Sequence, residues 1–361
     1  MDDWTWVRQA RGSRDWRDAQ QRMARAIRGT PTAALDIAQA LDDDLYRHGF
    51  DIALDALRRD AFVLSCQDRG AEATRVAVEL GARPPVQPTP SPRPDYVRLR
   101  NAREIVGRRP PEEVGDLLRA DLLRHDDPEF GLLLSHELVL RGSGAGPVAS
   151  WYARWAESAA HPLAQLPLRL LDIEAGLGSC LPQYGAGNGS SWTGLPDLPA
   201  GRGPLGDLIP GVGSPAPVLT DLVAAPFQDW LDYSNGSVQV ARYILGDTFP
   251  ADLPELRPDR EAVLVPPARV VQSLFSAASN GGAYSPSPGG ALARLRVWTS
   301  LRALLRLPAD VPVDEVAQAA ADATWIQLAT DDDWFDDVAW DVWLVVTDGA
   351  SVTTVAATDT D

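Results

Sequence analysis

The feature that most constrains the fold is a β-hairpin signal near the end of the chain. Two runs rich in apolar and β-branched residues, 340–347 and 351–357, flank the dipeptide Asp348-Gly349, which suits a tight type I′ turn. The first run is apolar on both faces, and a strand that buries both faces lies inside a sheet and not at its edge. We therefore predict an antiparallel sheet at the C-terminus, to which residues 325–329 add a strand.

The N-terminal half has the spacing of helices. Apolar residues recur every three or four positions, as at Leu35, Ala38, Leu41 and Leu45, in several segments before residue 184. Proline and glycine separate these segments into successive short helices, which favours an array of α-hairpins, although no fixed repeat period is present. Together with the hairpin, this pattern predicts an α+β protein with a helical N-terminal part and a C-terminal α+β domain.

Two segments rich in proline and glycine predict the domain boundaries. Residues 84–94 contain six prolines in eleven positions, which suits a stiff extended linker. In residues 185–217, glycine and proline supply 15 of 33 positions, the composition of a long loop and not of a packed element. We therefore expect helical subdomains at residues 1–83 and 95–184 and an α+β domain at residues 218–361.

Charge is distributed unevenly along the chain. The formal net charge is -17, and residues 307–361 hold 13 acidic residues and no basic residue. A negative field of this kind repels phosphate backbones and membrane headgroups, and it favours a basic partner. We therefore expect a basic protein or peptide as the partner, no nucleic acid at the C-terminal face and no membrane. The oligomeric state is left open.

The absence of lysine excludes several chemistries. All 33 basic residues are arginine, so the chain has no lysine for a Schiff base, a pyridoxal anchor, a Walker A loop or a kinase-type strand. A GC-rich genome explains this bias, and avoidance of lysine modification is the alternative. The two cysteines, Cys66 and Cys180, lack the spacing of a disulfide framework or a zinc site, so we expect buried thiols and no cofactor.

The chain also lacks the signals that direct a protein to a membrane or to secretion. No apolar stretch is long enough for a membrane helix. The acidic start differs from the basic end and long apolar run of a secretory signal. These two observations predict a cytoplasmic protein.

The first candidate site is acidic and bears tryptophan. Tryptophan beside carboxylates can bind an arginine-bearing partner through cation–π contact, although Trp334 and Trp343 can equally belong to the core of a sheet, as we expect of Trp325 and Trp340. The carboxylates could also hold a divalent cation, but a run of like charges is more often a solvated turn. The residues predicted to bind the partner are Asp331, Asp332, Asp333, Trp334, Asp336, Asp337 and Trp343.

The second candidate site is a glycine-rich break between two helical segments. At Asn280, Gly281 and Gly282 the backbone could approach a ligand closely. Tyr284 would supply a phenol and Arg294 a bidentate guanidinium. A break of this kind is more often a plain turn, which is the alternative for these five residues.

Four short segments of the C-terminal third resemble the motifs of a sequence family. They are residues 279–284 (Ser-Asn-Gly-Gly-Ala-Tyr), Trp334-Phe335, Ala339-Trp340-Asp341 and the terminal residues 356–361 (Ala-Ala-Thr-Asp-Thr-Asp). They are similar to the Gly-Gly-Ala-Tyr block, the Trp-Phe and Ala-Trp-Asp block and the Ala-Thr-Asp-Thr-Asp tail of an uncharacterised actinobacterial family that has no assigned activity. The resemblance implies an actinobacterial, cytoplasmic origin and little chemistry.

These observations predict a cytoplasmic, non-catalytic interaction protein that binds a basic partner through an acidic, Trp-bearing C-terminal face. One alternative is a metal-dependent hydrolase in which C-terminal aspartates hold two Mg²⁺ or Mn²⁺ ions. Another is an acidic inhibitor or immunity protein that mimics nucleic acid. The first hypothesis requires that the acidic tail folds into an ordered sheet and that arginines from the helical half do not neutralise its carboxylates.

Overall fold

The structure is a computed structural model of the chain, which divides into two compact units. The helical unit comprises Met1–Ala164 and Pro182–Ser191, and the sheet unit comprises Gln165–Leu181 and Trp192–Asp361. The residues that the structure describes are 5–13, 16–83, 96–119, 128–143, 152, 161–184, 190–191, 194–196, 198–250, 256–284, 287–331, 334–335 and 340–360. The combination of helices and an antiparallel sheet confirms the predicted α+β class.

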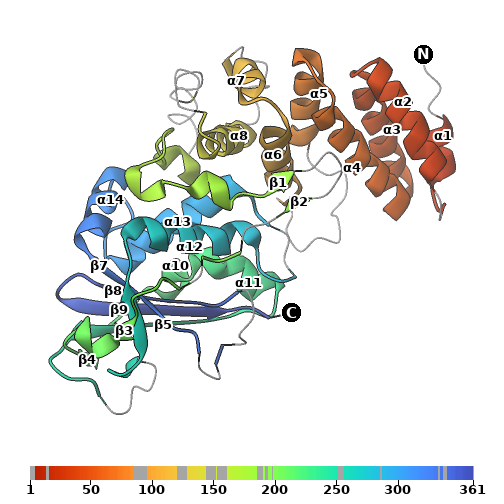
Figure 1. Cartoon of the computed structure of the whole chain (residues 1–361). Helices are drawn as coiled ribbons and strands as arrows, with labels where there is room; N and C mark the ends of the chain where they lie inside the picture. Colours follow the sequence, from red (N-terminus) through yellow and green to blue (C-terminus); the bar gives the residue numbers. More distant parts are fainter. Residues whose placement is uncertain are drawn as a thin grey trace. The chain divides into compact units, whose positions relative to one another are not determined.

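The described part of the helical unit is built almost entirely from α-helices (Figure 1). Helix α4 begins where Asp51 accepts hydrogen bonds from the backbone N–H groups of Ala53 and Leu54, at 3.0 and 3.1 Å, which satisfies two of the free donors of the first turn. The elements are α1 (Thr5–Ala10), α2 (Arg17–Gly29), α3 (Ala33–His48), α4 (Ile52–Gln67), α5 (Ala71–Ala82), α6 (Tyr96–Arg108), α7 (Pro111–Arg119), α8 (Pro128–Leu140) and the two-stranded ladder of β1 (Gln183–Tyr184) and β2 (Ser190–Ser191).

The helices on the two sides of residues 84–94 share one core. Helix α5 contacts α6, and α6 contacts α8. At Gly81 a Cβ atom would lie 2.8 Å from Ile105 Cδ1 and 3.0 Å from Phe130 Cζ, so α5 packs closely against α6 and α8 at this glycine, and a larger residue would require the Ile105 side chain to shift. Residues 1–83 and 95–164 of the two predicted helical subdomains therefore belong to the same unit, whereas residues 165–181 belong to the sheet unit. The predicted linker lies outside the described residues.

The sheet unit contains an antiparallel sheet with the strand order β3-β6-β7-β8-β9-β5-β4 in its described part. The predicted hairpin is present, because β8 and β9 pair with Thr347 opposite Val352 across the turn that holds Gly349. Strand β8 lies between β7 and β9 and buries both faces, as predicted. The strands are β3 (Gly203–Pro204), β4 (Val212–Pro215), β5 (Ser237–Leu245), β6 (Glu261–Leu264), β7 (Thr324–Leu328), β8 (Val342–Thr347) and β9 (Ser351–Thr358).

Helices cover one face of this sheet (Figure 1). Trp230, Phe275 and Trp298 are completely buried in this helical layer. Trp325 of β7 is buried, as predicted, and its indole Nε1 donates to the carbonyl of Ala320 at 2.8 Å. The helices of the unit are α10 (Thr220–Val223), α11 (Gln228–Tyr233), α12 (Pro267–Asn280), α13 (Gly290–Leu304) and α14 (Val313–Asp322), together with short 3₁₀ turns such as η2 (Asp172–Glu174).

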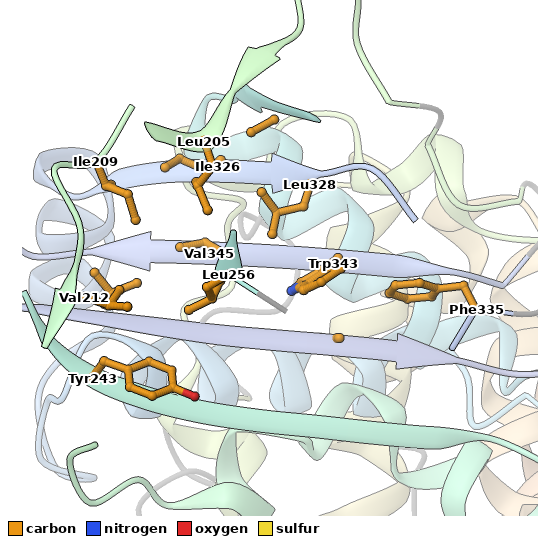
Figure 2. Close-up of a cluster of buried hydrophobic side chains, with 13 residues drawn as sticks. Leu205, Ile209, Val212, Tyr243, Leu256, Ile326, Leu328, Phe335, Trp343 and Val345 are labelled. Atoms are coloured by element: carbon orange, nitrogen blue, oxygen red, sulfur yellow. The ribbon is translucent and has the colours of Figure 1, made fainter. Parts of the chain in front are cut away.

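The opposite face carries a second apolar cluster, which Figure 2 shows. Leu205, Ile209 and Val212 of this cluster come from the segment 185–217. The prediction of an unpacked loop is therefore wrong for the second half of this segment, which forms β3 and β4 at the two edges of the sheet. Proline is tolerated on edge strands because no ladder donor is needed there, and the interspersed Leu, Ile and Val residues supply the buried surface.

The cysteines and the apolar character of the helices can be compared with the sequence predictions. Both cysteines are buried free thiols, as predicted, and burial raises the pKa of the Cys66 thiol. In the part of the chain that the structure describes, no helix combines the length and the apolar character needed to cross a membrane.

Candidate functional site

The acidic, Trp-bearing segment connects β7 to β8. Of the residues predicted to bind a partner, Asp332, Asp333, Asp336 and Asp337 lie outside the described residues, and Asp331, Trp334 and Trp343 are described. Asp331 is 73% exposed, Trp334 is half-buried and Trp343 is 3% exposed. The three residues therefore differ in how far they can reach a partner.

The aromatic residues of this segment form a continuous chain of ring contacts. Trp334 meets Phe335 edge-on at 4.8 Å between ring centroids, and Phe335 packs on Trp343 at 5.4 Å. The indole Nε1 of Trp343 donates to Oγ1 of Thr354 on β9 at 2.9 Å. Trp343 therefore belongs to the core of the sheet, which is the alternative that the sequence leaves open. Trp334 lies at the outer end of the series of ring contacts.

Arg260 joins this aromatic chain to Asp331. Its guanidinium carbon lies 4.3 Å from the centroid of the Trp343 ring, and its Nη1 lies 3.6 Å from Oδ1 of Asp331. The predicted cation–π contact at Trp343 is therefore made by an arginine of the chain itself. Arg260 is not among the predicted site residues, because it precedes β6, far along the chain from Trp343, and no local pattern links the two. We call Arg260, Asp331, Trp334, Phe335 and Trp343 the aromatic–acidic site.

Other arginines of the sheet unit also meet carboxylates of the acidic tail. Arg169 Nη2 lies 2.9 Å from Asp314 Oδ1, and Arg306 Nη1 lies 3.7 Å from Asp348 Oδ2. The first pair is largely solvated and the second partly solvated, so the negative field is reduced locally and not abolished. Glu315 on α14 is exposed as well. The described tail thus keeps carboxylates at its surface, although arginines outside residues 307–361 contact three of them.

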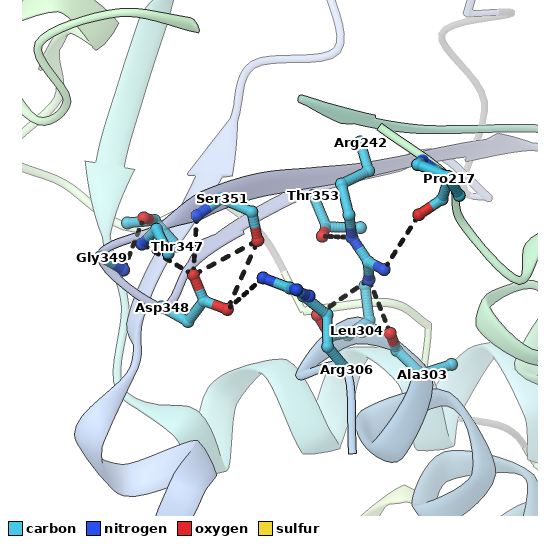
Figure 3. A network of polar contacts seen from close by, with 11 residues as sticks. Pro217, Arg242, Ala303, Leu304, Arg306, Thr347, Asp348, Gly349, Ser351 and Thr353 are labelled. Atoms are coloured by element: carbon cyan, nitrogen blue, oxygen red, sulfur yellow. Dashed lines mark hydrogen bonds and ion pairs between the residues drawn. The ribbon is translucent and has the colours of Figure 1, made fainter. Parts of the chain in front are cut away.

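The hairpin turn at Asp348 shows how this charge supports the fold (Figure 3). Burial opposes ionisation of Asp348, but the backbone N–H groups of Ala350 and Ser351, at 2.9 and 2.8 Å from Oδ1, together with the Ser351 hydroxyl and Arg306, lower its pKa. The carboxylate therefore holds the turn in its ionised form, because the donors favour the charged state.

Arg242 lies in the same network and binds no carboxylate in Figure 3. Its Nη2 donates to the carbonyls of Ala303 and Leu304 at 2.7 and 3.3 Å, and its Nε donates to Thr353 Oγ1 at 2.7 Å. Burial, with a further contribution from Arg306, lowers its pKa. A cation at the C-terminal end of α13 interacts favourably with the helix dipole and satisfies its free carbonyls.

The second predicted site separates into two structural features, and the first is Arg294. Its side chain is completely buried, and Nε and Nη2 donate to the two carboxylate oxygens of Glu174 at 2.6 and 2.7 Å. Its Nη1 and Nη2 also donate to the carbonyls of Pro167 and Arg169, both at 2.8 Å. In this structure the guanidinium is committed to contacts within the chain.

The second feature is the turn after α12. Gly281 and Gly282 have φ angles of 79° and 81°, which glycine adopts without strain. The N–H of Ala283 donates to Oδ2 of Asp359 at 2.7 Å, and a Cβ on Gly282 would collide with that same oxygen. Asn280 is buried and Tyr284 is exposed. The glycine turn therefore receives a carboxylate of the chain's own C-terminus.

The Ala-Trp-Asp segment meets the same region. Asp341 Oδ1 accepts a hydrogen bond from Thr358 Oγ1 at 2.5 Å. Trp340 is half-buried, although a core position is predicted for it. Its ring meets the buried Trp230 edge-on, at 6.2 Å between ring centroids. The Gly282 Cβ position is also only 2.9 Å from Trp230 Cδ1. Three of the four motif segments that carry the family resemblance, 279–284, 340–341 and 356–360, are thus linked by these contacts, whereas Phe335 of the fourth packs on Trp343.

No group of three or more His, Cys, Asp or Glu residues that could hold a metal ion is present among the residues that the structure describes. Asp332, Asp333, Asp336 and Asp337 lie outside that set. The carboxylates of Asp331, Asp341 and Asp359 therefore form no described metal centre.

The fold and these contacts define an α+β protein in whose sheet unit Thr358 and Asp359 bind Asp341 and the turn after α12. The chain belongs to a family of unknown function (DUF6183), whose model matches residues 16–361. This match confirms the predicted membership of an uncharacterised family and extends it from the last third to nearly the whole chain. No curated protein and no solved structure matches the chain. The actinobacterial origin stays a prediction.

Proposed function

We propose that the chain is a cytoplasmic, non-catalytic interaction protein that binds a basic protein or peptide through the acidic, Trp-bearing face of its sheet unit. Asp331 and Trp334 are the described residues that would contact the partner. The observation that carries this proposal is the exposed Asp331 carboxylate beside an aromatic chain that is anchored in the core.

Trp334 is suited to contact a guanidinium. Its ring is half-buried against Phe335, which is itself packed on Trp343. Such packing restricts the ring before a partner arrives, so little side-chain entropy is lost on binding. A tryptophan face attracts a cation through its quadrupole, and aromatic anchors contribute strongly to the affinity of interfaces.

Asp331 would supply the ionic part of the contact. Its carboxylate is mostly in solvent. Nη1 of Arg260 lies 3.6 Å from one of its two oxygens, Oδ1. An ionised carboxylate has two oxygens that can accept a bidentate arginine. Arg260 is buried under the aromatic chain, so it orients Asp331 and leaves the outer side of the carboxylate available.

The proposal is tested by fluorescence anisotropy with a labelled oligo-arginine peptide and an oligo-glutamate peptide. We expect the full chain to bind the basic peptide alone, and the affinity to fall as salt is raised because salt screens exposed charges. The double variant Asp331→Asn, Trp334→Ala should bind on the order of tenfold more weakly, about 1.4 kcal/mol.

Asp172→Asn is the matched control, because Asp172 is an exposed acid of the same unit outside the acidic tail. Equal weakening by the control would contradict a specific contact, and absence of salt-dependent binding would overturn the proposal. Calorimetry with Mg²⁺, Mn²⁺ and Ca²⁺ separates it from the hydrolase alternative, since the interaction proposal expects no heat and no thermal shift.

A further inference from the structure

The helical unit contains a cavity that has no counterpart in the sequence predictions. Its volume is about 160 Å³, and it lies between helices α3, α4, α5 and α6. The apolar part of the wall is formed by Ala38, Phe62, Leu80 and Val97, and the polar part by Asp55, Arg58, Arg59, Tyr96, Arg100 and Asn101. Apolar walls with a few converging polar groups are typical of small-ligand sites.

The polar part of the wall is rich in positive charge. Three arginines, Arg58, Arg59 and Arg100, line the cavity, together with one acidic residue, Asp55. Arg58 has a carboxylate of its own, because its Nε lies 2.5 Å from Oδ1 of Asp42. The charge state of the cavity therefore depends on Asp55, Arg59 and Arg100.

Arg59 and Arg100 share a single carboxylate, that of the buried Glu104. Arg59 Nη2 lies 3.1 Å from Oε1 of Glu104, and Arg100 Nε lies 4.0 Å from the same oxygen. Arg108 Nε lies 3.6 Å from the other oxygen. One carboxylate thus lies within 4.0 Å of three guanidinium groups, and a charge that is withdrawn from water without full compensation is costly.

Three polar atoms of the cavity wall have no hydrogen-bond partner in the described structure. They are Nη1 of Arg59, Nε of Arg100 and Oδ1 of Asn101. Asn101 is only 4% exposed, and its amide Nδ2 donates to the carbonyl of Gly81 at 3.3 Å. Buried polar groups are nearly always satisfied in folded proteins, so Nη1 of Arg59 and Nε of Arg100 offer two unsatisfied donors to a further group, and Oδ1 of Asn101 offers an acceptor.

The lowered pKa of Arg100 is consistent with incomplete compensation of its charge in the cavity wall. Burial, followed by the nearby charge of Arg59, lowers its pKa to about 10, against the opposing influence of Tyr96 and Glu104. A second anion in the cavity would stabilise the charged guanidinium and return the pKa toward its usual range.

We propose that this cavity binds a small anion that carries a phosphate or carboxylate group. Arg59 and Arg100 would hold the charged group, since the planar guanidinium matches either anion bidentately. Phe62 and Val97 would contact an apolar portion of the ligand. One water occupies roughly 30 Å³ of liquid, so a volume of about 160 Å³ suits an anion that replaces several waters. The cavity lies in the helical unit, so this proposal is independent of the aromatic–acidic site.

The test is thermal unfolding of the full chain with inorganic phosphate or succinate, each matched in ionic strength by sodium chloride. We expect a saturable rise in Tm with at least one probe and none with chloride. Comparison of the two probes identifies the preferred anion class. Calorimetry with the effective probe should show that Arg100→Gln weakens binding at least tenfold.

Arg75→Gln is the matched control, because Arg75 lies on α5 of the same unit and pairs with Glu79 at the surface. This variant should bind the probe like the original chain. Arg59→Gln provides a second test if circular dichroism shows that Arg100→Gln is unfolded. The absence of a saturable shift with both probes, or full binding by both cavity variants, would overturn the proposal and indicate a cavity that holds water only.

Discussion

Two arginines, the buried Arg294 in the sheet unit and the partly buried Arg100 in the helical unit, differ in how their charge is compensated. Arg294 donates to both oxygens of Glu174 at hydrogen-bond distance, and neither side chain is exposed. Arg100 reaches Glu104 only at 4.0 Å and shares it with other arginines. The first arginine completes a structural network, whereas the second leaves capacity for a ligand.

The carboxylate of Glu174 is satisfied by several donors of the sheet unit besides Arg294. It also accepts from the indole Nε1 of Trp298 at 2.9 Å and from the backbone N–H of Leu171 at 2.9 Å. A buried polar network whose groups are all satisfied rigidifies the structure, while a partly satisfied one is costly. The contrast therefore predicts opposite responses to mutation in the two units.

The largest effect is expected from Glu174→Ala. This variant leaves the guanidinium of Arg294 buried without its carboxylate, which should lower the free energy of unfolding by about 3–5 kcal/mol. Denaturation by urea measures the change. The control Asp314→Ala removes an exposed ion pair with Arg169 and should cost less than about 1 kcal/mol. Similar losses in the two variants would show that the buried pair is not special.

A smaller loss of unfolding free energy is expected from Gly282→Ala. This variant tests whether the contact between the glycine turn and Asp359 stabilises the sheet unit. The control is Gly349→Ala, since Gly349 has a similar φ of 83° but open space around its Cβ position. The strained backbone alone should cost about 1–2 kcal/mol, and the collision with Asp359 should add about 1–3 kcal/mol. Equal losses would mean that Asp359 moves away freely.

Asp348→Ala should cost about 1 kcal/mol at neutral pH, because the turn loses hydrogen bonds to a carboxylate. The folded-state pKa of Asp348 is lowered, so its contribution is present above the unfolded pKa of about 4 and is lost as pH falls through the folded-state value. Urea denaturation of both chains from pH 7 to pH 2 measures this. A difference that does not change with pH would refute the ionic role.

The smallest effect on stability is expected from Arg100→Met without added anion. Removing one of three cations that share Glu104 relieves repulsion and burial cost, so stability should stay within about 1 kcal/mol or rise. Urea denaturation beside Glu174→Ala gives the direct comparison. A loss as large as that of Glu174→Ala would show that Arg100 is as structural as Arg294 and would remove the contrast between the units.

Local patterns were sufficient for the elements with strong periodicity. The Asp348-Gly349 turn and the two-faced apolar run before it led to β8 and β9, since turn chemistry and side-chain alternation depend on neighbouring residues. Helical spacing led to α3 and α4 for the same reason. The segment 185–217 was misjudged because its glycine and proline content describes backbone freedom and says nothing about where Leu205 and Val212 pack.

The candidate sites were only partly accessible from the sequence. Clustering of acids and tryptophans pointed to Asp331 and Trp334, which the structure brings together with Arg260. The same logic grouped Arg294 with the glycine turn, although its partner is Glu174. Nothing local indicated the arginine-lined cavity, because its wall combines residues of four helices.

The α+β class, the interior hairpin, the acidic and arginine-free tail and the exclusion of lysine chemistry follow from the amino-acid sequence, because each depends on composition or on residues close in the chain. Which polar groups meet depends on the folded arrangement. Glu174 with Arg294, Asp359 with Ala283, and Glu104 with its three arginines are contacts between distant segments. Such pairs are selected by packing and desolvation, which act on positions in space and leave no periodic pattern along the chain.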